Sequence, residues 1–200
     1  MKRKAYDGVY NRYIKRGIDF CLALIGLVIA AIPMAIVAIA IKAESKGPVI
    51  FKQDRIGYKG KVYKMYKFRS MCVGAEKGGV YSDNKDSRVT KVGKFIRATS
   101  IDELPQLFNI LKGEMSLVGP RPERPFFVEK FREEIPRYMV KHQVRPGLTG
   151  WAQVNGYSGD TSIRKRIECD LYYIENWSVG FDIKIMFLTI FKGFINKNAY

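Results

Sequence analysis

The chain has 200 residues, enough for one compact domain and one accessory element, and its 47% apolar content argues against disorder. Lys and Arg number 35 against 19 Asp and Glu, and the net charge of +16 predicts an anionic partner: lipid headgroups, nucleic acid or a phosphorylated substrate. The 3 cysteines are odd in number and widely spaced, so the sequence indicates neither a disulfide framework nor a zinc site.

An uncharged apolar segment covers residues 20–41 and is long enough to cross a bilayer as one helix. Pro33 lies inside this segment, and proline kinks a helix because it donates no backbone hydrogen bond. Lys15 and Arg16 precede the segment and Lys42 follows it, and positive flanks on both sides resist translocation. The sequence therefore predicts a re-entrant helix–break–helix that enters and leaves by one membrane face, with a single spanning helix as the alternative.

The polar residues beside this segment are expected at the level of the lipid headgroups. Lys15 and Arg16 are predicted to bind lipid phosphates, and Asp19 is predicted to pair with a base. Residues 1–45 are thus expected to form a membrane anchor. Residues 46–200 are expected to form a cytoplasmic catalytic domain that ends in an interfacial helix.

After the anchor, the pattern changes to that of a β-hairpin. Residues 49–51 are a short strand candidate that follows the turn signal Gly47-Pro48. Residues 62–68 alternate apolar and basic side chains, which is the period of a half-exposed strand. Together these segments predict a short hairpin with a basic face, followed by a polar loop over residues 72–86.

The remainder of the chain is predicted to be mainly helical. Helical periodicity begins at Lys91, and the apolar pattern that follows ends at Gly113. Amphipathic helices are expected over residues 126–140 and 162–176, with a glycine-rich loop over residues 145–156 between them.

The most apolar part of the second half is residues 179–195, which predict an interfacial helix lying on the membrane. A buried core helix is the alternative. The predicted fold class is α+β and mainly helical. It combines a re-entrant N-terminal membrane helix–break–helix, a short β-hairpin and interfacial amphipathic helices around a small globular body.

Asp102 and Glu103 are adjacent carboxylates at the start of a predicted helix. Ser100, three residues before Glu103, matches a capping box, which explains the pair without catalysis. If Asp102 is instead the N-cap, Pro105 falls in the first turn, where proline is tolerated. Either arrangement puts the carboxylates where the helix dipole favours their ionised form and a bound phosphate. One carboxylate is then suited to bind Mg²⁺, and the other is suited to attack phosphorus as a nucleophile.

Basic residues elsewhere are candidates for binding substrate phosphates. Arg121 lies between two prolines, which stiffen the backbone around a guanidinium suited to bidentate phosphate binding. Lys67 and Arg69 lie two positions apart and so share one face of the predicted strand. A surface turn and a solvated strand edge are the competing interpretations.

The glycine-rich segment combines flexible backbone with an aromatic ring and an amide. Such a combination suits a nucleobase, held by stacking and hydrogen bonding. The candidate residues are Arg145, Thr149, Trp151 and Gln153. An ordinary turn over a buried tryptophan is the alternative. His142, the only histidine, has no partner motif and is interpreted as structural or lipid-facing.

Several longer motifs occur together and in order along nearly the whole chain. They are Lys15-Arg16-x-x-Asp19, Gly47-Pro48-Val49-Ile50-Phe51-x-Gln53-x-Arg55-x-Gly57, Lys67-Phe68-Arg69-Ser70-Met71, Ser100-x-Asp102-Glu103-Leu104-Pro105-Gln106-Leu107, Met115-Ser116-x-Val118-Gly119-Pro120-Arg121-Pro122-Glu123 and Val144-Arg145-Pro146-Gly147-x-Thr149-Gly150. On these motifs the chain resembles the bacterial sugar transferases, the small monotopic phosphoglycosyl transferases. In that family serine often precedes the hairpin proline, whereas Ile32 stands there in this chain.

The resemblance implies transfer of a sugar 1-phosphate from a UDP-sugar to polyprenyl (undecaprenyl) phosphate, with release of UMP. This is the first membrane step of capsule, exopolysaccharide, lipopolysaccharide or glycoprotein-glycan synthesis. The resemblance also implies Asp102 as the nucleophile that forms a covalent phosphosugar–enzyme, Glu103 beside it as a Mg²⁺ ligand, and Arg97 and Arg121 around the phosphates. It further implies a monotopic, re-entrant anchor on the cytoplasmic face of the bacterial inner (plasma) membrane.

Two alternatives stay open at the level of sequence. Direct displacement would use Asp102 as a base and form no covalent intermediate. A membrane-tethered nucleic-acid-binding or scaffold protein would explain the basic charge, but it leaves Arg121 and the carboxylate pair without a role. A UDP-sugar, polyprenyl phosphate and membrane lipids are therefore the expected partners, nucleic acid is not, and a homo-oligomer is compatible with the sequence.

Overall fold

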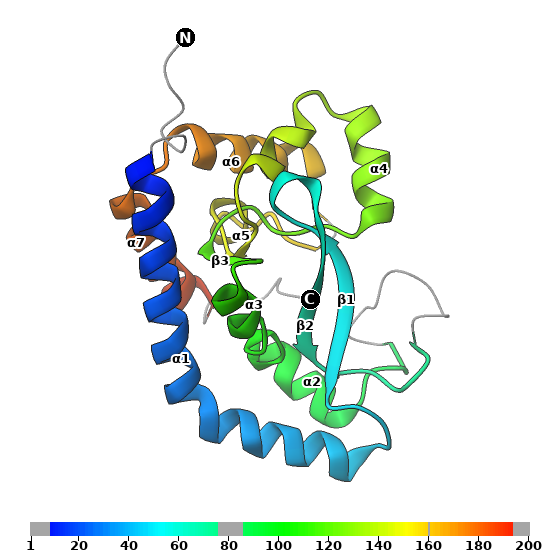
Figure 1. Ribbon diagram of the computed structural model, residues 1–200. Coiled ribbons are helices and arrows are strands. Elements are labelled where there is room, and N and C mark those ends of the chain that lie inside the picture. The colour runs from blue at the N-terminus through cyan, green and yellow to red at the C-terminus, as the bar shows by residue number, and fades with distance from the viewer. Residues whose placement is uncertain (1–8, 76–85, 160, 194–200) are drawn as a thin grey trace.

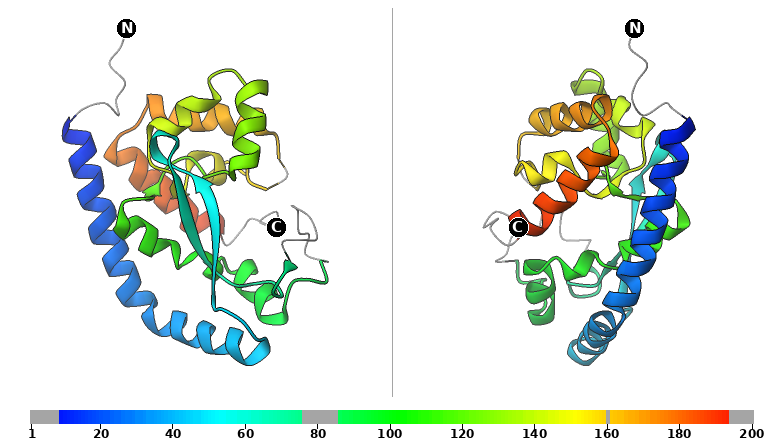
Figure 2. Two further views of the ribbon diagram at one scale, coloured as in Figure 1. Left: turned by 45° about the vertical axis from the view of Figure 1, so that its right-hand side comes forward. Right: turned by 90° about the vertical axis from the view of Figure 1, so that its left-hand side faces the viewer.

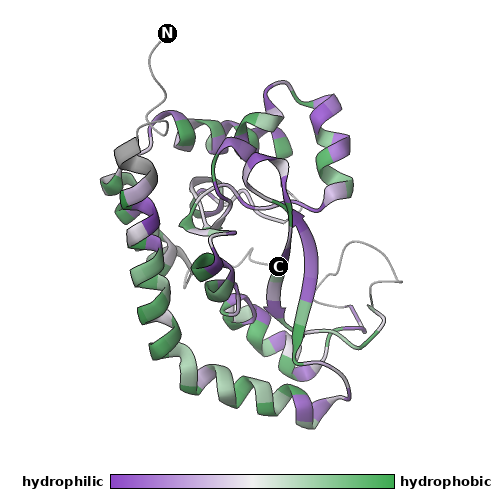
Figure 3. Cartoon of the chain, viewed as in Figure 1, coloured by the Kyte–Doolittle hydropathy of each residue, from purple (hydrophilic) through white to green (hydrophobic). Residues whose placement is uncertain are grey.

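The first element is a long helix, α1 (Val9–Glu44), which contains the predicted membrane segment. The computed structural model describes residues 9–75, 86–159 and 161–193. Within those ranges, α1 is the one helix long and apolar enough to cross a membrane by length and composition, over Tyr13–Glu44. Figure 3 shows apolar residues along most of it. The helix changes direction part-way along (Figure 1), which matches the kink that Pro33 predicts.

The helices and strands that follow α1 lie mainly on the inner side of its bend (Figures 1 and 2). Towards its start, Ala23 is fully buried in a cluster with Leu107, and towards its end Ile41 is buried with Phe68 and Ile96. The opposite face is exposed and apolar. Its large side chains are Ile25, Val28, Ile29, Ile32, Ile36 and Ile39. One face of α1 therefore packs on the protein body, and the other presents an apolar surface suited to lipid.

A two-stranded antiparallel hairpin follows α1. Its elements are β1 (Ile50–Ile56), the short turn η2 (Tyr58–Gly60) and β2 (Val62–Phe68). Ile50 lies opposite Phe68, and Ile56 lies opposite Val62. The predicted hairpin is confirmed, although its first strand is longer than the expected residues 49–51.

Three short helical segments come next. They are α2 (Lys91–Ala98), the 3₁₀ turn η4 (Ile101–Glu103) and α3 (Gln106–Lys112). Gly113 ends α3 with a φ of +83°, a left-handed conformation that glycine adopts without strain. The helical pattern from Lys91 and its end at Gly113 are thus confirmed. Of the loop predicted over residues 72–86, residues 76–85 lie outside the described part of the chain.

A parallel pair of short strands was not predicted. It joins β3 (Ser116–Val118) to β4 (Gly147–Thr149), with Val118 opposite Thr149. The loop expected over residues 145–156 is therefore wrong in part, because this segment contains β4 and the short helix α5 (Trp151–Val154). Elements of three or four residues are too short to show a periodic pattern in the sequence.

Helices make up the second half of the body. They are α4 (Pro125–Glu134), the 3₁₀ segment η5 (Tyr138–Gln143), α6 (Ile163–Glu175) and α7 (Val179–Gly193). The helix predicted over residues 126–140 ends at Glu134, because Pro136 cannot continue it and Arg137 has a left-handed φ of +63°. The helix predicted over residues 162–176 is confirmed, with Ser162 as its N-cap.

The last helix, α7, has one buried side and one exposed side. Ile185 is fully buried in a cluster with Val118 and Tyr173, whereas Ile183 and Phe187 are largely exposed. The buried side matches the alternative prediction of a core helix. The exposed apolar side is the one that would lie on the membrane in the predicted interfacial position. Residues 194 and 195 of the predicted segment lie outside the described residues. The chain is thus mainly helical, with a short hairpin and one long apolar N-terminal helix.

Candidate active site

Asp102 and Glu103 lie in η4, a tight turn that precedes α3. Leu104 N donates to Ile101 O at 3.1 Å and closes this turn. Pro105 has no N–H group, so the regular helix begins only after it. Both carboxylates are buried.

The structure corrects both capping interpretations of this segment. Ser100 has a left-handed φ of +56°, and its side chain makes no capping hydrogen bond, so there is no capping box. Asp102 is not an N-cap of α3 either, because the residue in that position is Pro105. Ser100 instead holds an uncommon backbone conformation two residues before Asp102, and such conformations concentrate at functional sites.

Two cations converge on Glu103 from different elements. Lys67 Nζ, at the end of β2, lies 2.6 Å from Glu103 Oε1 and 3.8 Å from Asp102 Oδ2. Arg121 Nη2, in the loop after β3, lies 3.1 Å from the same oxygen of Glu103. The structure thus brings together two carboxylates and two bases that the sequence singled out.

The two carboxyl groups differ in acidity because their surroundings differ. Burial by itself raises the pKa of Glu103, but Lys67 and Arg121 outweigh it and lower the pKa to about 2. Burial raises the pKa of Asp102 above its ordinary value, against the opposing charge of Lys67. Adjacent carboxyl groups with divergent pKa values are typical of sites where each has a separate role.

Asp102 Oδ1 is buried and has no hydrogen-bond partner among the described residues. A buried acceptor without a donor is costly, so a bound group that interacts with it is favoured. The described residues hold no cluster of three or more His, Cys, Asp or Glu side chains. Mg²⁺ is commonly held by one or two carboxylates together with substrate phosphates and water. The donor set formed by Asp102 and Glu103 therefore fits Mg²⁺ bound with a diphosphate.

Arg97 approaches the pair from the last turn of α2. Its Nε donates to Ser70 Oγ at 2.8 Å, which orients the guanidinium. Its charge opposes the rise that burial causes in the pKa of Asp102. Arg97 therefore adds positive charge on the side of Asp102.

Arg69 does not join this group, which corrects the prediction that it binds a substrate phosphate. It is buried, and its guanidinium donates to Lys46 O at 2.9 Å and to Ser45 O at 2.7 Å. Carbonyls at this end of α1 lack helical partners and favour a cation. The face shared by Lys67 and Arg69 was expected from strand alternation, but β2 ends at Phe68.

The residues predicted to hold a nucleobase make contacts within the protein. Arg145 Nε donates to Gly113 O at 2.8 Å, at the C-terminal end of α3. Thr149 Oγ1 lies 2.7 Å from Thr189 Oγ1 of α7, at hydrogen-bond distance. Both side chains therefore have structural partners where the sequence predicted a ligand.

Trp151 is also a packing residue. Its ring stacks on Tyr172 and meets Phe181 edge-on, with centroid separations of 6.2 Å and 5.0 Å. Gln153 Nε2 donates to Leu148 O at 3.3 Å, while its buried Oε1 has no partner among the described residues. Among the residues predicted to hold a nucleobase, Gln153 thus still has a polar atom to which a ligand can bind. Trp151 packs against other aromatic rings, as expected from the alternative of an ordinary turn over a tryptophan.

The loop that carries Arg121 is fixed by backbone contact with β4. Gly119 N donates to Thr149 O at 2.9 Å, and Gly147 N donates to Pro120 O at 3.0 Å. A Cβ atom on Gly147 would lie 2.1 Å from Gly119 N, so this approach requires glycine. Two glycine motifs far apart in the sequence therefore pack against each other and hold Arg121 beside Glu103.

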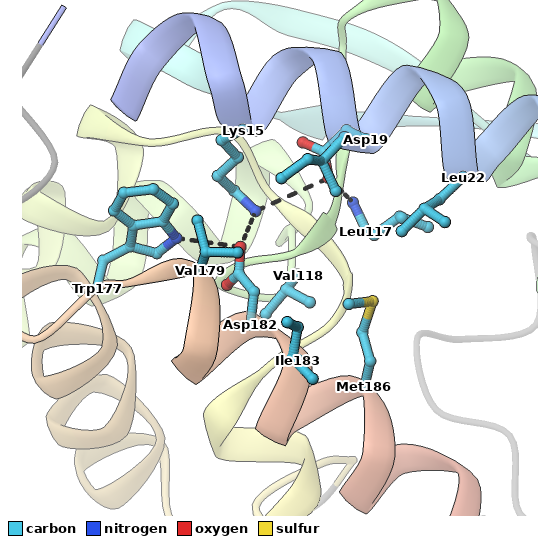
Figure 4. Close-up of a pocket in the computed structure, with 11 residues that line it drawn as sticks. Lys15, Asp19, Leu22, Leu117, Val118, Trp177, Val179, Asp182, Ile183 and Met186 are labelled. Atoms are coloured by element: carbon cyan, nitrogen blue, oxygen red, sulfur yellow. Dashed lines mark hydrogen bonds and ion pairs between the residues drawn. The ribbon is translucent and has the colours of Figure 1, made fainter. Parts of the chain in front are cut away.

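Lys15 lies buried where α1 meets α7. Its Nζ is 2.6 Å from Asp182 Oδ2 and 3.8 Å from Asp19 Oδ1 (Figure 4). Asp182 also accepts hydrogen bonds from Tyr173 and Trp177. A cavity of about 180 Å³ adjoins this group and is lined mainly by apolar side chains. The predicted pairing of Asp19 with a base is present, but Lys15 has a protein partner where the sequence predicted a lipid phosphate.

Arg16 likewise binds protein. It donates to Ile110 O at 2.5 Å and to Leu111 O at 2.7 Å, so it satisfies the last carbonyls of α3. Together with Arg145 it stabilises the negative end of the helix whose other end carries the carboxylate pair. The headgroup contacts predicted for Lys15 and Arg16 are thus replaced by contacts that fasten α1 to the body.

A family model described as bacterial sugar transferase matches residues 10–196. The chain belongs to this family. It is 51% identical to the UDP-glucose:undecaprenyl-phosphate glucose-1-phosphate transferase of Escherichia coli K12, over 95% of this chain and 42% of that protein. It is also 51% identical to the UDP-N-acetylgalactosamine-undecaprenyl-phosphate N-acetylgalactosaminephosphotransferase of Aeromonas hydrophila, over 89% of this chain and 43% of that protein.

A third relative is covered more completely. The UDP-glucose:undecaprenyl-phosphate glucose-1-phosphate transferase of Caulobacter vibrioides is 42% identical over 93% of this chain and 72% of that protein. The chain spans less than half the length of the first two relatives. Family membership and the long apolar helix together indicate a membrane-associated protein.

The chain also contains a set of contacts around Glu123 that the sequence did not reveal. Glu123 Oε1 accepts from Arg166 Nη1 of α6 at 2.8 Å. Arg55 Nη1 of β1 donates to Pro122 O at 3.0 Å. Both contacts hold the loop just after Arg121. The acid at the end of the proline motif was visible in the sequence, but its distant partners were not.

Proposed function

We propose that this sugar transferase moves a sugar 1-phosphate from a UDP-sugar to polyprenyl (undecaprenyl) phosphate and releases UMP, the first membrane step of glycoconjugate synthesis. One observation carries the proposal: Glu103 is held ionised by two cations, next to a buried Asp102 whose Oδ1 lacks a partner among the described residues. The substrate class is supported by relatives named for UDP-glucose or UDP-N-acetylgalactosamine together with undecaprenyl phosphate.

Asp102 is the group suited to attack the phosphorus that carries the sugar. One carboxylate oxygen forms a bond to this phosphorus, and the bond from phosphorus to the bridging diphosphate oxygen breaks. UMP leaves with the bridging oxygen, and the sugar phosphate stays on Asp102 as an acyl phosphate. Burial supports this role, because it raises the pKa of Asp102 and so makes the ionised carboxylate a stronger base and nucleophile.

The second step returns Asp102 to its starting state. A phosphate oxygen of polyprenyl phosphate attacks the same phosphorus, and the bond from phosphorus to the Asp102 oxygen breaks. The products are the polyprenyl diphosphate sugar and the free carboxylate. One aspartate thus serves a soluble donor and a lipid acceptor in turn, without holding both at once.

The surrounding positive groups offset the negative charge of the diphosphate. Arg121 is the more exposed of the two cations on Glu103, with 27% of its side chain exposed against 17% for Lys67. Arg121 therefore suits contact with substrate phosphate, while Lys67 keeps Glu103 ionised. Mg²⁺, bound by Glu103 and Asp102, would supply further neutralisation between carboxylate and diphosphate.

The contacts of α1 support a monotopic anchor with both ends on one membrane face. Lys15 near its start pairs with Asp182 of the body, and the carbonyl oxygens of Ser45 and Lys46 just after its end accept from Arg69 of the same body. A helix crossing the bilayer would carry these two contacts to opposite sides. We therefore propose that the bend lies within the membrane and that the body lies on the cytoplasmic face, where UDP-sugars are found.

A UMP-release assay tests the activity. Purified protein is incubated with polyprenyl phosphate, Mg²⁺ and each of a panel of UDP-sugars, and turnover with at least one sugar is expected. No release across the panel contradicts the function. Incubation with a UDP-sugar labelled in the sugar, without acceptor, separates the two mechanisms: label retained on the protein supports the covalent route, and its absence in an active enzyme indicates direct displacement.

A further inference from the structure

Asn109 lies in the middle of α3 and is fully buried. Its side-chain amide forms three hydrogen bonds. Oδ1 accepts from Tyr66 N at 3.0 Å, and Nδ2 donates to Lys64 O at 2.8 Å and to Glu114 Oε2 at 2.6 Å. An amide nitrogen only donates and an amide oxygen only accepts, so these partners fix the orientation of the side chain.

These bonds lie along the edge of β2 that β1 does not occupy. A strand edge presents N–H and C=O groups that need partners when they are buried. The Asn109 amide supplies both kinds of partner, to Tyr66 N and to Lys64 O, and so takes the place of one residue of a further strand. β2 is thereby tied directly to α3.

The tie lies next to Lys67, the lysine that pairs with Glu103. Tyr63 and Met65 of β2 are buried in the cluster that includes α3, and Lys67 follows on the same face, since alternate residues of a strand share a face. Lys67 Nζ ends 2.6 Å from Glu103 Oε1. The offset between β2 and α3 therefore decides whether the ammonium reaches the carboxylate, and the buried Asn109 fixes this offset by hydrogen bonds to the backbone of β2.

We propose that Asn109 is a positioning residue of the active site, acting through Lys67 on Glu103 and Asp102. Its catalytic consequence rests on the proposed function, but the placement of Lys67 does not. Glu114 contributes to the same positioning, because its carboxylate accepts the second hydrogen bond from the Asn109 amide nitrogen.

A double-mutant cycle tests the catalytic part of this proposal. Asn109→Leu keeps the size of the side chain and removes the hydrogen bonds. In the otherwise unchanged enzyme we expect kcat for UMP release to fall by about 100-fold, as for a misplaced catalytic group, with a smaller change in KM. In a Lys67→Met background the same change is expected to cost less than about twofold, because Lys67 is no longer there to be positioned. Equal losses in both backgrounds would overturn the proposal.

Lysine labelling gives a readout that does not depend on turnover. The protein is exposed briefly to an acetylating N-hydroxysuccinimide ester, and the extent of modification at each lysine is read by mass spectrometry. Asn109→Leu is expected to raise labelling of Lys67 several-fold, while Lys141, buried beside Asp170, stays protected. A joint rise at Lys67 and Lys141 would mean general loss of structure and would contradict a local role. Asn176→Ala removes an exposed amide and is the matched control.

Further variants keep the test decisive. Should Asn109→Leu fail to fold, Glu114→Ala removes one bond of the same amide from a less buried site, and a selective rise in Lys67 labelling is again expected. Unchanged labelling of Lys67 in Glu114→Ala would then overturn the proposal. If the unaltered protein releases no UMP but Asn109→Leu selectively exposes Lys67, the proposed function fails and the positioning role stands.

Discussion

The ammonium of Lys67 lies 2.6 Å from Oε1 of Glu103, although 36 positions separate the two residues in the chain. The bond joins the end of a strand to the turn before a helix. It keeps Glu103 ionised in a buried site, where an unpaired carboxylate would take up a proton. The same ammonium lies 3.8 Å from Asp102 Oδ2, so the charge of one lysine acts on both carboxyl groups.

Replacement of Lys67 by methionine is therefore expected to move the acidic limb of the activity profile. Without the ammonium, the pKa values of Glu103 and Asp102 rise, so activity is lost at a higher pH as the pH falls. The measurement is kcat/KM for UMP release between pH 5 and pH 9. Lys64→Met is the matched control, since Lys64 lies on the same strand in an exposed pair with Asp54. An unshifted acidic limb in Lys67→Met would refute the control of the carboxyl groups by this lysine.

Asp102→Asn is expected to abolish UMP release and the covalent labelling by a UDP-sugar. The amide keeps the shape of the side chain but has no ionised oxygen to attack phosphorus. The variant should remain membrane-bound and folded, because Asp102 Oδ1 has no hydrogen-bond partner among the described residues to lose. Asp54→Asn, an exposed acid on β1, is the control and should retain activity. Turnover in Asp102→Asn would remove the nucleophile from the proposal.

Lys15→Met is expected to lower the free energy of unfolding by about 3 to 5 kcal/mol, because it leaves Asp182 charged, buried and without its cation. Thermal or denaturant unfolding in detergent or nanodiscs measures the change. Lys130→Met removes the lysine of an exposed pair with Glu134 and should cost about 0 to 1 kcal/mol. Similar costs for the two variants would show that the buried pair does not fasten α1 to α7.

Ser100→Ala and Thr90→Ala compare a residue that only resembles a cap with a true one. Thr90 Oγ1 accepts from Gly93 N at 2.9 Å and caps α2, so its loss should cost about 1 kcal/mol. Ser100 makes no such bond, so its replacement should change stability by less than about 0.5 kcal/mol. Unfolding curves of both variants decide the matter. A cost at Ser100 equal to that at Thr90 would restore the capping box.

His142 is expected to make the fold sensitive to mild acid. Burial, followed by the charge of Lys141, lowers the pKa of His142 from its ordinary 6.5 to about 4. A lowered pKa in the folded state stabilises the fold above pH 6.5, and this contribution is lost as the pH falls towards 4. Between pH 7.5 and pH 5 the loss amounts to about 2 kcal/mol.

The test compares unfolding of the unaltered protein and His142→Phe at those two pH values. The variant should lose less stability on acidification. Glu103, whose pKa is lowered to about 2, contributes over a lower pH range and does not obscure the comparison. An identical loss in both proteins would assign the sensitivity to other groups.

The sequence predicted the elements that carry a long or distinct pattern. The apolar segment with Pro33, the hairpin and the helix over residues 162–176 each show several repeats of one period, or a proline, and the structure contains all three. The strands β3 and β4 were missed because three residues do not establish a period, and their pairing depends on two glycines that permit close backbone contact.

For the candidate site, the sequence predicted which residues lie together better than it predicted their contacts. Lys67, Arg121 and the two carboxylates meet as expected, since each stands in a distinctive local motif. Arg69 and Arg145 bind helix-end carbonyls instead, and charge alone does not distinguish a substrate-binding arginine from one that satisfies backbone. Asn109 was overlooked because a single amide inside an amphipathic helix gives no signal until its strand partner is known.

The pairing of Lys15 with Asp182 has a consequence for the order of events during synthesis. The two residues are 167 positions apart, so the lysine leaves the ribosome and reaches the membrane long before its partner exists. Until α7 is made, α1 has a positive charge at its edge that no other helix neutralises by this contact. Closure of the fold at this contact therefore waits for α7, and α1 gains this attachment to the body only after that helix has been made.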